Sequence, residues 1–271
     1  MMFQADSFND REEFLKLYNE QGFVVVKGNF DDALLAKFRS AMLELIEVER
    51  KVLKKEDTNY RDYGFLLCGL YYLDRYPFLL DVFDNAEYLK YVEWILDKYF
   101  IMHLYSCNCL LPGKGDNKAA DIHVDSPRLM PEGYNNFVAT MINMDDYTSD
   151  NGATWILPAS QKYLEKPSEE FFYKHGIQLT VPKGSICFFN PRVWHATGAN
   201  HTNDWRTCLL IAFCKPWMKQ RVDVPKFLGH LDKKLIPERF HQLLGYQSQP
   251  PTTFEEFYGA PEMRTYTQPY V

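Results

Sequence analysis

Ile101-Met-His-Leu-Tyr-Ser-Cys-Asn-Cys-Leu-Leu111 is the first of six short apolar runs that decide the fold of this chain. Clusters of Gly, Pro, Asn and Asp, which favour turns, separate the runs. The other five runs occupy residues 137–144, 153–157, 177–181, 185–189 and 206–214. Evenly spaced short strands with turn signals between them are typical of a β-sandwich or barrel. We therefore expect a β core over about residues 100–215.

The residues on either side of this core have a different character. The first 100 residues are mostly helical in pattern and form a predicted support for the core. Helices are predicted over residues 10–21, from Asp31 or Asp32 onward, and over residues 85–98, with a short strand at 22–28. The last stretch, residues 216–271, is rich in proline and has one helical piece at 237–244. We interpret it as a cover on the core and not as a separate domain.

Composition excludes several classes of partner. The chain has 271 residues and a net charge of −6, without a basic stripe, so nucleic acid is not an expected partner. Its apolar runs are far too short to span a bilayer, which predicts no membrane segment. The first ten residues lack the features of a secretion signal, and the six cysteines lie mostly in apolar, strand-like runs. Reduced thiols and a cytoplasmic location follow as expectations, whereas the oligomeric state stays open.

His123-Val124-Asp125, with His195 far along the chain, is the pattern that indicates chemistry. Residues two apart in an extended strand point to the same face, so His123 and Asp125 can converge on one point. Two histidines and one carboxylate form the facial triad that holds non-heme Fe(II) and leaves positions open. Taken alone, a His-x-Asp triplet is common by chance, and a single histidine such as His195 in an apolar stretch is more often a core residue than a metal ligand. The joint pattern favours a metal site.

Arg206 is the second informative residue, because it stands at the start of the apolar run that ends at Cys214. An unpaired charge inside an apolar strand is costly and needs a partner. Either a local carboxylate such as Asp204 pairs with Arg206, or the carboxylate of a ligand does.

The segment Asn200-His-Thr-Asn203 is turn-like, which suggests a hairpin between the strands that carry His195 and Arg206. In that register Thr197 lies opposite Arg206, and His195 lies opposite Cys208. The hairpin would place one hydroxyl and one guanidinium together just beyond the metal. That arrangement suits a dicarboxylate that chelates iron at one end and is gripped at the other.

Four segments carry a resemblance to a known family. They are His123-Val-Asp125, Asn151-Gly-Ala-Thr-Trp-Ile-Leu-Pro-Ala-Ser160, Pro182-Lys-Gly-Ser-Ile-Cys-Phe-Phe189, and Trp194-His-Ala-Thr-Gly198 followed by Arg206. In this order they resemble the phytanoyl-CoA dioxygenase family of Fe(II)/2-oxoglutarate oxygenases. The resemblance implies an α+β chain of one domain, residues 1–271. Its core would be a double-stranded β-helix (jelly-roll, cupin-like), wrapped by N-terminal and C-terminal helices.

The resemblance also implies roles for residues. His123, Asp125 and His195 would bind Fe(II) as the catalytic metal ligands. Arg206 would hold the C5 carboxylate of the co-substrate 2-oxoglutarate, with Thr197 as a hydroxyl helper; Asn108 is a candidate for its other end, the alternative being a strand asparagine satisfied by backbone.

The reaction implied by the family consumes O2, releases succinate and CO2, and hydroxylates an unactivated C–H bond. We expect a small-molecule substrate, a metabolite or natural-product intermediate. Halogenation is disfavoured because Asp125 is present. Four alternatives stay open: the same chemistry ending in desaturation, cyclisation or epimerisation; a protein side-chain hydroxylase; a non-catalytic jelly-roll binding module; and a zinc hydrolase, which would leave Arg206 unexplained.

Substrate contacts are the least determined part of the sequence. Arg128 lies three residues past Asp125 and would rim the pocket, where it could meet an anionic substrate together with Lys114 and Lys118. Tyr71 and Tyr72 could line the pocket from the helical half, although packing on a helix face is the alternative. The glycine-rich loop 112–121 is expected to act as a lid.

Overall fold

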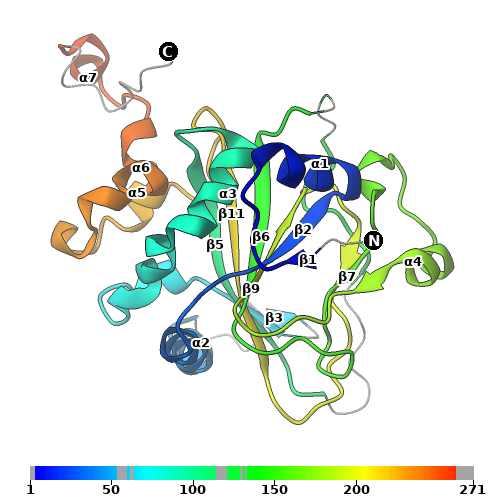
Figure 1. The fold of residues 1–271 in the computed structure, drawn as a ribbon. Helices are drawn as coiled ribbons and strands as arrows, with labels where there is room; N and C mark the ends of the chain where they lie inside the picture. The colour runs from blue at the N-terminus through cyan, green and yellow to red at the C-terminus, as the bar shows by residue number, and fades with distance from the viewer. Residues whose placement is uncertain are drawn as a thin grey trace.

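A computed structural model describes residues 4–53, 60–61, 64–113, 121–128, 131 and 133–260. Its centre is an eight-stranded sheet of order β1-β2-β9-β6-β11-β5-β4-β3 (Figure 1). The strands are β1 (Gln4–Ala5), β2 (Phe23–Lys27), β3 (Tyr60–Arg61), β4 (Gly64–Leu67), β5 (Ile101–Leu110), β6 (Phe137–Asn143), β9 (Ser185–Phe189) and β11 (Arg206–Cys214). A three-stranded sheet of order β10-β7-β8 contains β7 (Trp155–Ile156), β8 (Ile177–Gln178) and β10 (His195–Ala196).

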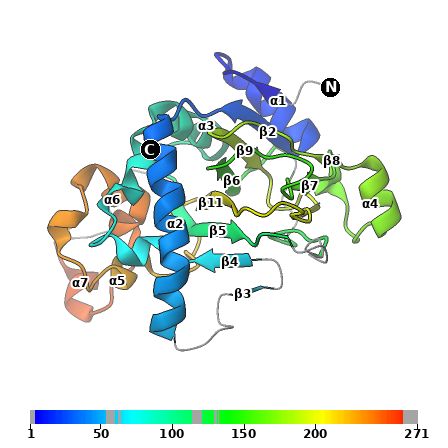
Figure 2. The ribbon, with the colours of Figure 1, turned by 90° about the horizontal axis from the view of Figure 1, so that it is seen from below.

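The two faces of the large sheet bury different clusters. Because side chains alternate along a strand, Leu209 and Ile211 of β11 point to one face and Cys208 to the other. Cys208 belongs to an inner cluster that also holds Ala139 of β6 and Ile156 of the small sheet. The small sheet therefore packs on the inner face, where Figure 2 shows β7 and β8 across from β9 and β6. This is the predicted jelly-roll.

Helices cover the outer face of the large sheet. They are α1 (Arg11–Gln21), α2 (Asp32–Leu53) and α3 (Ala86–Leu96), with 3₁₀ segments η1 (Gly69–Tyr72) and η2 (Pro77–Asp84) between α2 and α3. As predicted, Asp10 caps α1, its carboxylate accepting from the amides of Glu12 and Glu13. Fully buried side chains such as Phe14 and Val92 anchor the helices to the sheet, each contributing about 1.5–3 kcal/mol.

Residues 224–246 pack beside β5 and extend the same outer core, whereas residues 254–258 bury no side chain and stand away from it (Figure 1). The C-terminal elements are α5 (Val224–Phe227), η4 (Lys233–Leu235), η5 (Glu238–Phe240), α6 (His241–Leu244), η6 (Tyr246–Ser248) and α7 (Phe254–Tyr258). The predicted helical piece at 237–244 is thus a 3₁₀ turn followed by α6, which ends at left-handed Gly245. Two short elements, η3 (Ser160–Lys162) and α4 (Glu169–His175), lie between β7 and β8.

All six predicted strands are present, but the predicted hairpin is wrong. His195 pairs with Ile156 of β7, and Cys208 pairs with Asn108 and Asn143 in the other sheet. The chain crosses from one sheet to the other between β10 and β11, and the side chain of Asn200 fixes this connection. Its amide donates to the carbonyls of Leu111 and Asp204, both at 2.9 Å.

The cysteines are free thiols, and five of the six are buried, in agreement with the expectation. Burial raises the pKa of the Cys214 thiol to about 12, so this group is unreactive at neutral pH. No helix in the described part of the chain combines the length and the apolar character needed to cross a membrane.

Candidate metal centre

His123 and His195 lie side by side although they are far apart in the sequence. A two-residue β-bridge joins them: each backbone N–H donates to the other's carbonyl at 3.0 Å. Oδ1 of Asp125 lies 3.9 Å from Nε2 of His123 and 3.8 Å from Nε2 of His195. Two ligand atoms each about 2.1 Å from one ion are at most about 4.2 Å apart, so these separations fit a single metal ion.

Hydrogen bonds fix which ring nitrogen of each histidine faces Asp125. Nδ1 of His123 lies 2.8 Å from the carbonyl oxygen of Asp121, and Nδ1 of His195 lies 2.9 Å from that of Val193. A carbonyl only accepts, so Nδ1 is the protonated nitrogen in both rings and Nε2 presents its lone pair. Metal-binding histidines are oriented in this way. The donor set therefore fits the Fe(II) triad.

Arg192 clips together the loops that carry these ligands. It is buried, and its guanidinium donates to the carbonyls of Pro127, Gln161 at 3.0 Å and Tyr163 at 2.7 Å. The amide of Ser126 also donates to the carbonyl of Pro191 at 3.0 Å, which ties the Asp125 loop to the turn before His195. Arg192 was not among the residues predicted from the sequence. The available signal was an arginine within an otherwise apolar segment.

Arg206 is a buried cation without a charged partner. The residue is 2% exposed, and its Nη1 donates to the carbonyl of Gly152 at 2.6 Å. The guanidinium carbon lies 4.3 Å from the ring centroid of Tyr147, while Nε has no hydrogen-bond partner. Among the described residues Arg206 forms no ion pair. An unpaired buried charge is costly, so Arg206 is a candidate to bind an anionic ligand.

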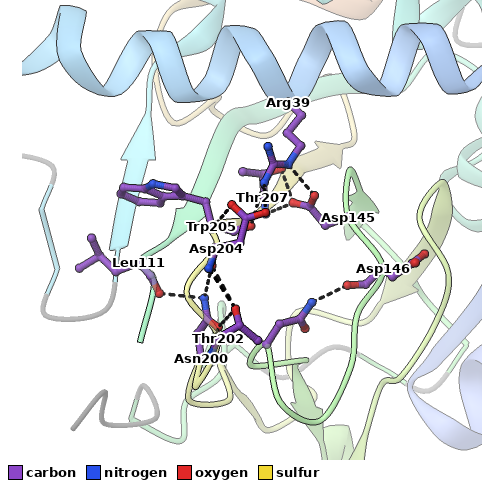
Figure 3. A network of polar contacts seen from close by, with 10 residues as sticks. Arg39, Leu111, Asp145, Asp146, Asn200, Thr202, Asp204, Trp205 and Thr207 are labelled. Atoms are coloured by element: carbon purple, nitrogen blue, oxygen red, sulfur yellow. Dashed lines mark hydrogen bonds and ion pairs between the residues drawn. The ribbon is translucent and has the colours of Figure 1, made fainter. Parts of the chain in front are cut away.

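The carboxylates near Arg206 are engaged elsewhere, as Figure 3 shows. Asp204 accepts from Nη2 of Arg39 at 2.9 Å, and Asp145 accepts from Nε of Arg39 at 2.6 Å. The other oxygen of Asp145 accepts from the amide and the hydroxyl of Thr207, at 2.7 and 2.8 Å (Figure 3). The alternative that Asp204 neutralises Arg206 is therefore wrong.

Two asparagines flank Cys208 on the face of the sheet that carries Arg206. Asn108 of β5 and Asn143 of β6 both pair with Cys208, so their side chains share its inner face. Asn143 is 1% exposed, and its Oδ1 has no hydrogen-bond partner. Asn108 was predicted from the sequence, but Asn143 was not, because it has the appearance of a polar residue that ends a strand.

Thr197 lies one residue beyond β10, on the chain that crosses towards Arg206. A Cβ placed on Gly152 would lie 2.6 Å from the carbonyl oxygen of Gly198. Gly152, whose carbonyl accepts from Arg206, thus touches the residue next to Thr197. The segment of Thr197 comes near Arg206 by this contact and not by the predicted hairpin.

A cavity of about 990 Å³ opens beside Asp125 and includes Arg128, which lies on its wall as expected. Tyr71 and Tyr72 are not among the residues that line this cavity. The ring of Tyr71 stacks on His230 at 4.2 Å, and Tyr72 packs against the outer core, in line with the packing alternative. Lys114, Lys118 and most of the expected lid at 112–121 fall outside the described residues.

A jelly-roll that brings two histidines and one aspartate to a point belongs to the class of mononuclear non-heme metalloproteins. The comparisons with known proteins narrow this class. The family model described as "Phytanoyl-CoA dioxygenase (PhyH)" matches residues 18–208. Dioxygenase FUM3 of Gibberella moniliformis is 30% identical over 92% of this chain and 86% of its own length. The human peroxisomal phytanoyl-CoA dioxygenase is 24% identical over 73% and 66%.

Solved structures show the same fold. AviO1 from Streptomyces viridochromogenes superimposes with a TM-score of 0.58 at 18% identity, over 78% of this chain and 97% of that chain. The carbocyclase SnoK gives 0.58 at 15% identity, over 83% and 92%. The chain belongs to the phytanoyl-CoA dioxygenase family and is a 2-oxoglutarate-dependent oxygenase, with Fe(II) and 2-oxoglutarate as its cofactors.

Proposed function

We propose that this protein hydroxylates an unactivated C–H bond of a small metabolite or natural-product intermediate, with release of succinate and CO2. In this proposal His123, Asp125 and His195 hold the iron, and Arg206 holds the C5 carboxylate of 2-oxoglutarate. The observation that carries the proposal is the pairing of a converging ligand set with a buried, unneutralised guanidinium in one jelly-roll.

Each side chain has a defined task in this reaction. Iron, when bound with 2-oxoglutarate and O2, supplies the oxidising power. The protonated Nδ1 atoms keep both histidines turned so that Nε2 faces the metal position. Arg206 supplies charge-assisted hydrogen bonds to the co-substrate in a dry site, where these bonds are strong. Thr197 and Asn108 are proposed to contact 2-oxoglutarate from the connection and from β5.

A second outcome of the same chemistry is supported by two structural neighbours. They are the α-ketoglutarate-dependent carbocyclase SnoK and the epimerase SnoN, both from nogalamycin biosynthesis. Desaturation, cyclisation and epimerisation use the same cofactors, and substrate placement decides among them. Neither the binding-module alternative nor the zinc-hydrolase alternative explains why Arg206 is buried without an ion pair. A protein hydroxylase remains distinguishable because it would require a folded partner for turnover.

The proposal is tested by measuring succinate formed by the purified protein with Fe(II), 2-oxoglutarate and O2. We expect slow succinate release without substrate, dependent on all three components and absent in Asp125→Ala. A thermal melt with Ni(II) as an inert ion should show added stability of about 2.7 kcal/mol when 2-oxoglutarate is present at 100 times its Kd. Neither succinate nor stabilisation would be seen if the jelly-roll were a binding module.

A further inference from the structure

We infer that the substrate is an amphipathic organic anion, and that Lys219 and Arg221 bind its negative group at the mouth of the cavity beside Asp125. The inference rests on the proposed function for the reaction, but the binding itself needs neither iron nor 2-oxoglutarate. It names the chemical class of the substrate and two residues that select it.

The first observation is the charge of the cavity. Six described residues that line it carry a permanent charge: Asp125, Arg128, Lys162, Arg192, Lys219 and Arg221. Five of these six are cationic, in a chain whose net charge is −6. Such a concentration of one sign in a concave site attracts the opposite charge.

Two of these cations, Lys219 and Arg221, are not neutralised by the described residues of the protein. The single carboxylate in the lining, that of Asp125, faces the two histidines. The guanidinium of Arg192 donates its hydrogen bonds to backbone carbonyls. Within the described parts of the chain, Lys219 and Arg221 form no ion pair. Burial and the charge of Arg221 lower the pKa of His103 on the adjoining wall, which favours the neutral form of that ring.

The second observation is the position of the cationic pair. The amide of Arg221 donates to the carbonyl of His103 at 3.1 Å, which fixes the 219–221 segment against β5. Arg206 pairs with Leu110 at the other end of that strand. Seven residues of strand separate His103 from Leu110, about 23 Å at the usual rise. An anion at Lys219 and Arg221 is therefore distinct from 2-oxoglutarate at Arg206.

The third observation is the apolar surface between the charged groups. It comes mainly from the inner faces of β5, β6 and β11, with one aromatic residue of the following loop. The residues are Leu104, Phe137, Ala139, Leu210, Ala212 and Trp217. A cavity of about 990 Å³ is at the upper end of the range for ligand sites and has room for a hydrocarbon body. The anionic group is a carboxylate or a phosphate, since both suit a Lys–Arg pair.

The inference is tested with three probes of equal chain length: decanoate, decyl phosphate and decan-1-ol. Trp217 is 59% exposed on the cavity wall, so its fluorescence should report occupancy, and Trp217→Phe should remove that signal. We expect at least one anion to bind about tenfold more tightly than the alcohol at low salt, and less so at high salt. The tighter of the two anions identifies the group.

Charge-matched variants locate the binding site. The double variant Lys219→Gln/Arg221→Gln should lose the preference for the anion. Lys174→Gln/Lys226→Gln removes the same charge from exposed positions outside the cavity lining and should keep it. Circular dichroism and melting curves show whether both variants fold.

Three results would overturn the inference. They are equal affinity for decan-1-ol and the anions, an equal loss in both double variants, and a loss caused by Arg206→Gln instead. Because these titrations omit iron and 2-oxoglutarate, failure of the oxygenase reaction would appear separately, in the succinate assay.

Discussion

The two halves of the proposed site are built in opposite ways. The proposed metal ligands stand on a β-bridge and a loop, with side chains 41% exposed for His123, 29% for Asp125 and 11% for His195. Arg206 stands at the start of a nine-residue strand inside the eight-stranded sheet and is 2% exposed. Backbone hydrogen bonds and the side chain of Arg192 hold the first half in place, whereas core packing holds the second.

This difference separates binding from stability. Water can reach the metal ligands, so replacing one of them should remove function with little effect on folding. Arg206 keeps a charge in a dry interior, and the protein bears that cost whether or not a ligand is present. A carboxylate that pairs with Arg206 should therefore contribute both to the affinity for 2-oxoglutarate and to the stability of the folded protein. The following experiments, in order of decreasing expected effect, sharpen or break this comparison.

His195→Ala should abolish metal binding and succinate formation, because it removes one of three ligands. The far-UV circular dichroism spectrum should be unchanged, and a Co(II) titration followed by absorbance measures the loss. His175→Ala, on helix α4 outside the site, is the matched control. Retained Co(II) affinity in His195→Ala would exclude this histidine as a ligand.

Arg206→Gln should raise the KM for 2-oxoglutarate about 10- to 100-fold while leaving Co(II) affinity intact. A charge-assisted hydrogen bond is worth about 1.5–3 kcal/mol, and 1.4 kcal/mol corresponds to a factor of ten. Steady-state succinate formation measures the change. An unaltered co-substrate requirement would show that Arg206 serves the fold alone.

Arg192→Gln should weaken metal affinity by about tenfold, since loss of a group that orients the ligands typically costs 10- to 100-fold. The physical reason is that the hydrogen bonds from Arg192 would no longer hold the loops of Asp125 and His195 together. Arg239→Gln, which breaks an exposed ion pair with Asp84, is the control for charge. Equal metal affinity in the two variants would remove Arg192 from the site.

Tyr71→Ala should have the smallest effect on function. It removes a ring that stacks on His230, so we expect a loss of about 1 kcal/mol in the free energy of unfolding. The kcat and the KM for 2-oxoglutarate should not change. Urea unfolding measures the free energy of unfolding, and the succinate assay measures the kinetic constants. A large fall in kcat would indicate that Tyr71 contacts the substrate.

Much of the architecture was predictable from local patterns. The six apolar runs and the capping residue Asp10 gave strands and a helix where the structure has them, because alternation and capping are properties of short segments. The hairpin failed because a turn-like composition at 200–203 does not reveal which sheet each flank joins. Hydrogen bonds from the side chain of Asn200 to the carbonyls of Leu111 and Asp204 fix the connection that joins the two sheets.

By itself the sequence determined the residue types of the candidate metal site, their order along the chain and the alternation of strands and turns. Only the tertiary structure decided that His195 bridges His123, that Arg39 pairs with the carboxylate of Asp204, and that the segment 217–221 lines the same cavity as Asp125. The physical reason is distance along the chain. Local patterns encode φ/ψ preferences and which face is buried, whereas ion pairs and cavities depend on residues that only folding brings together.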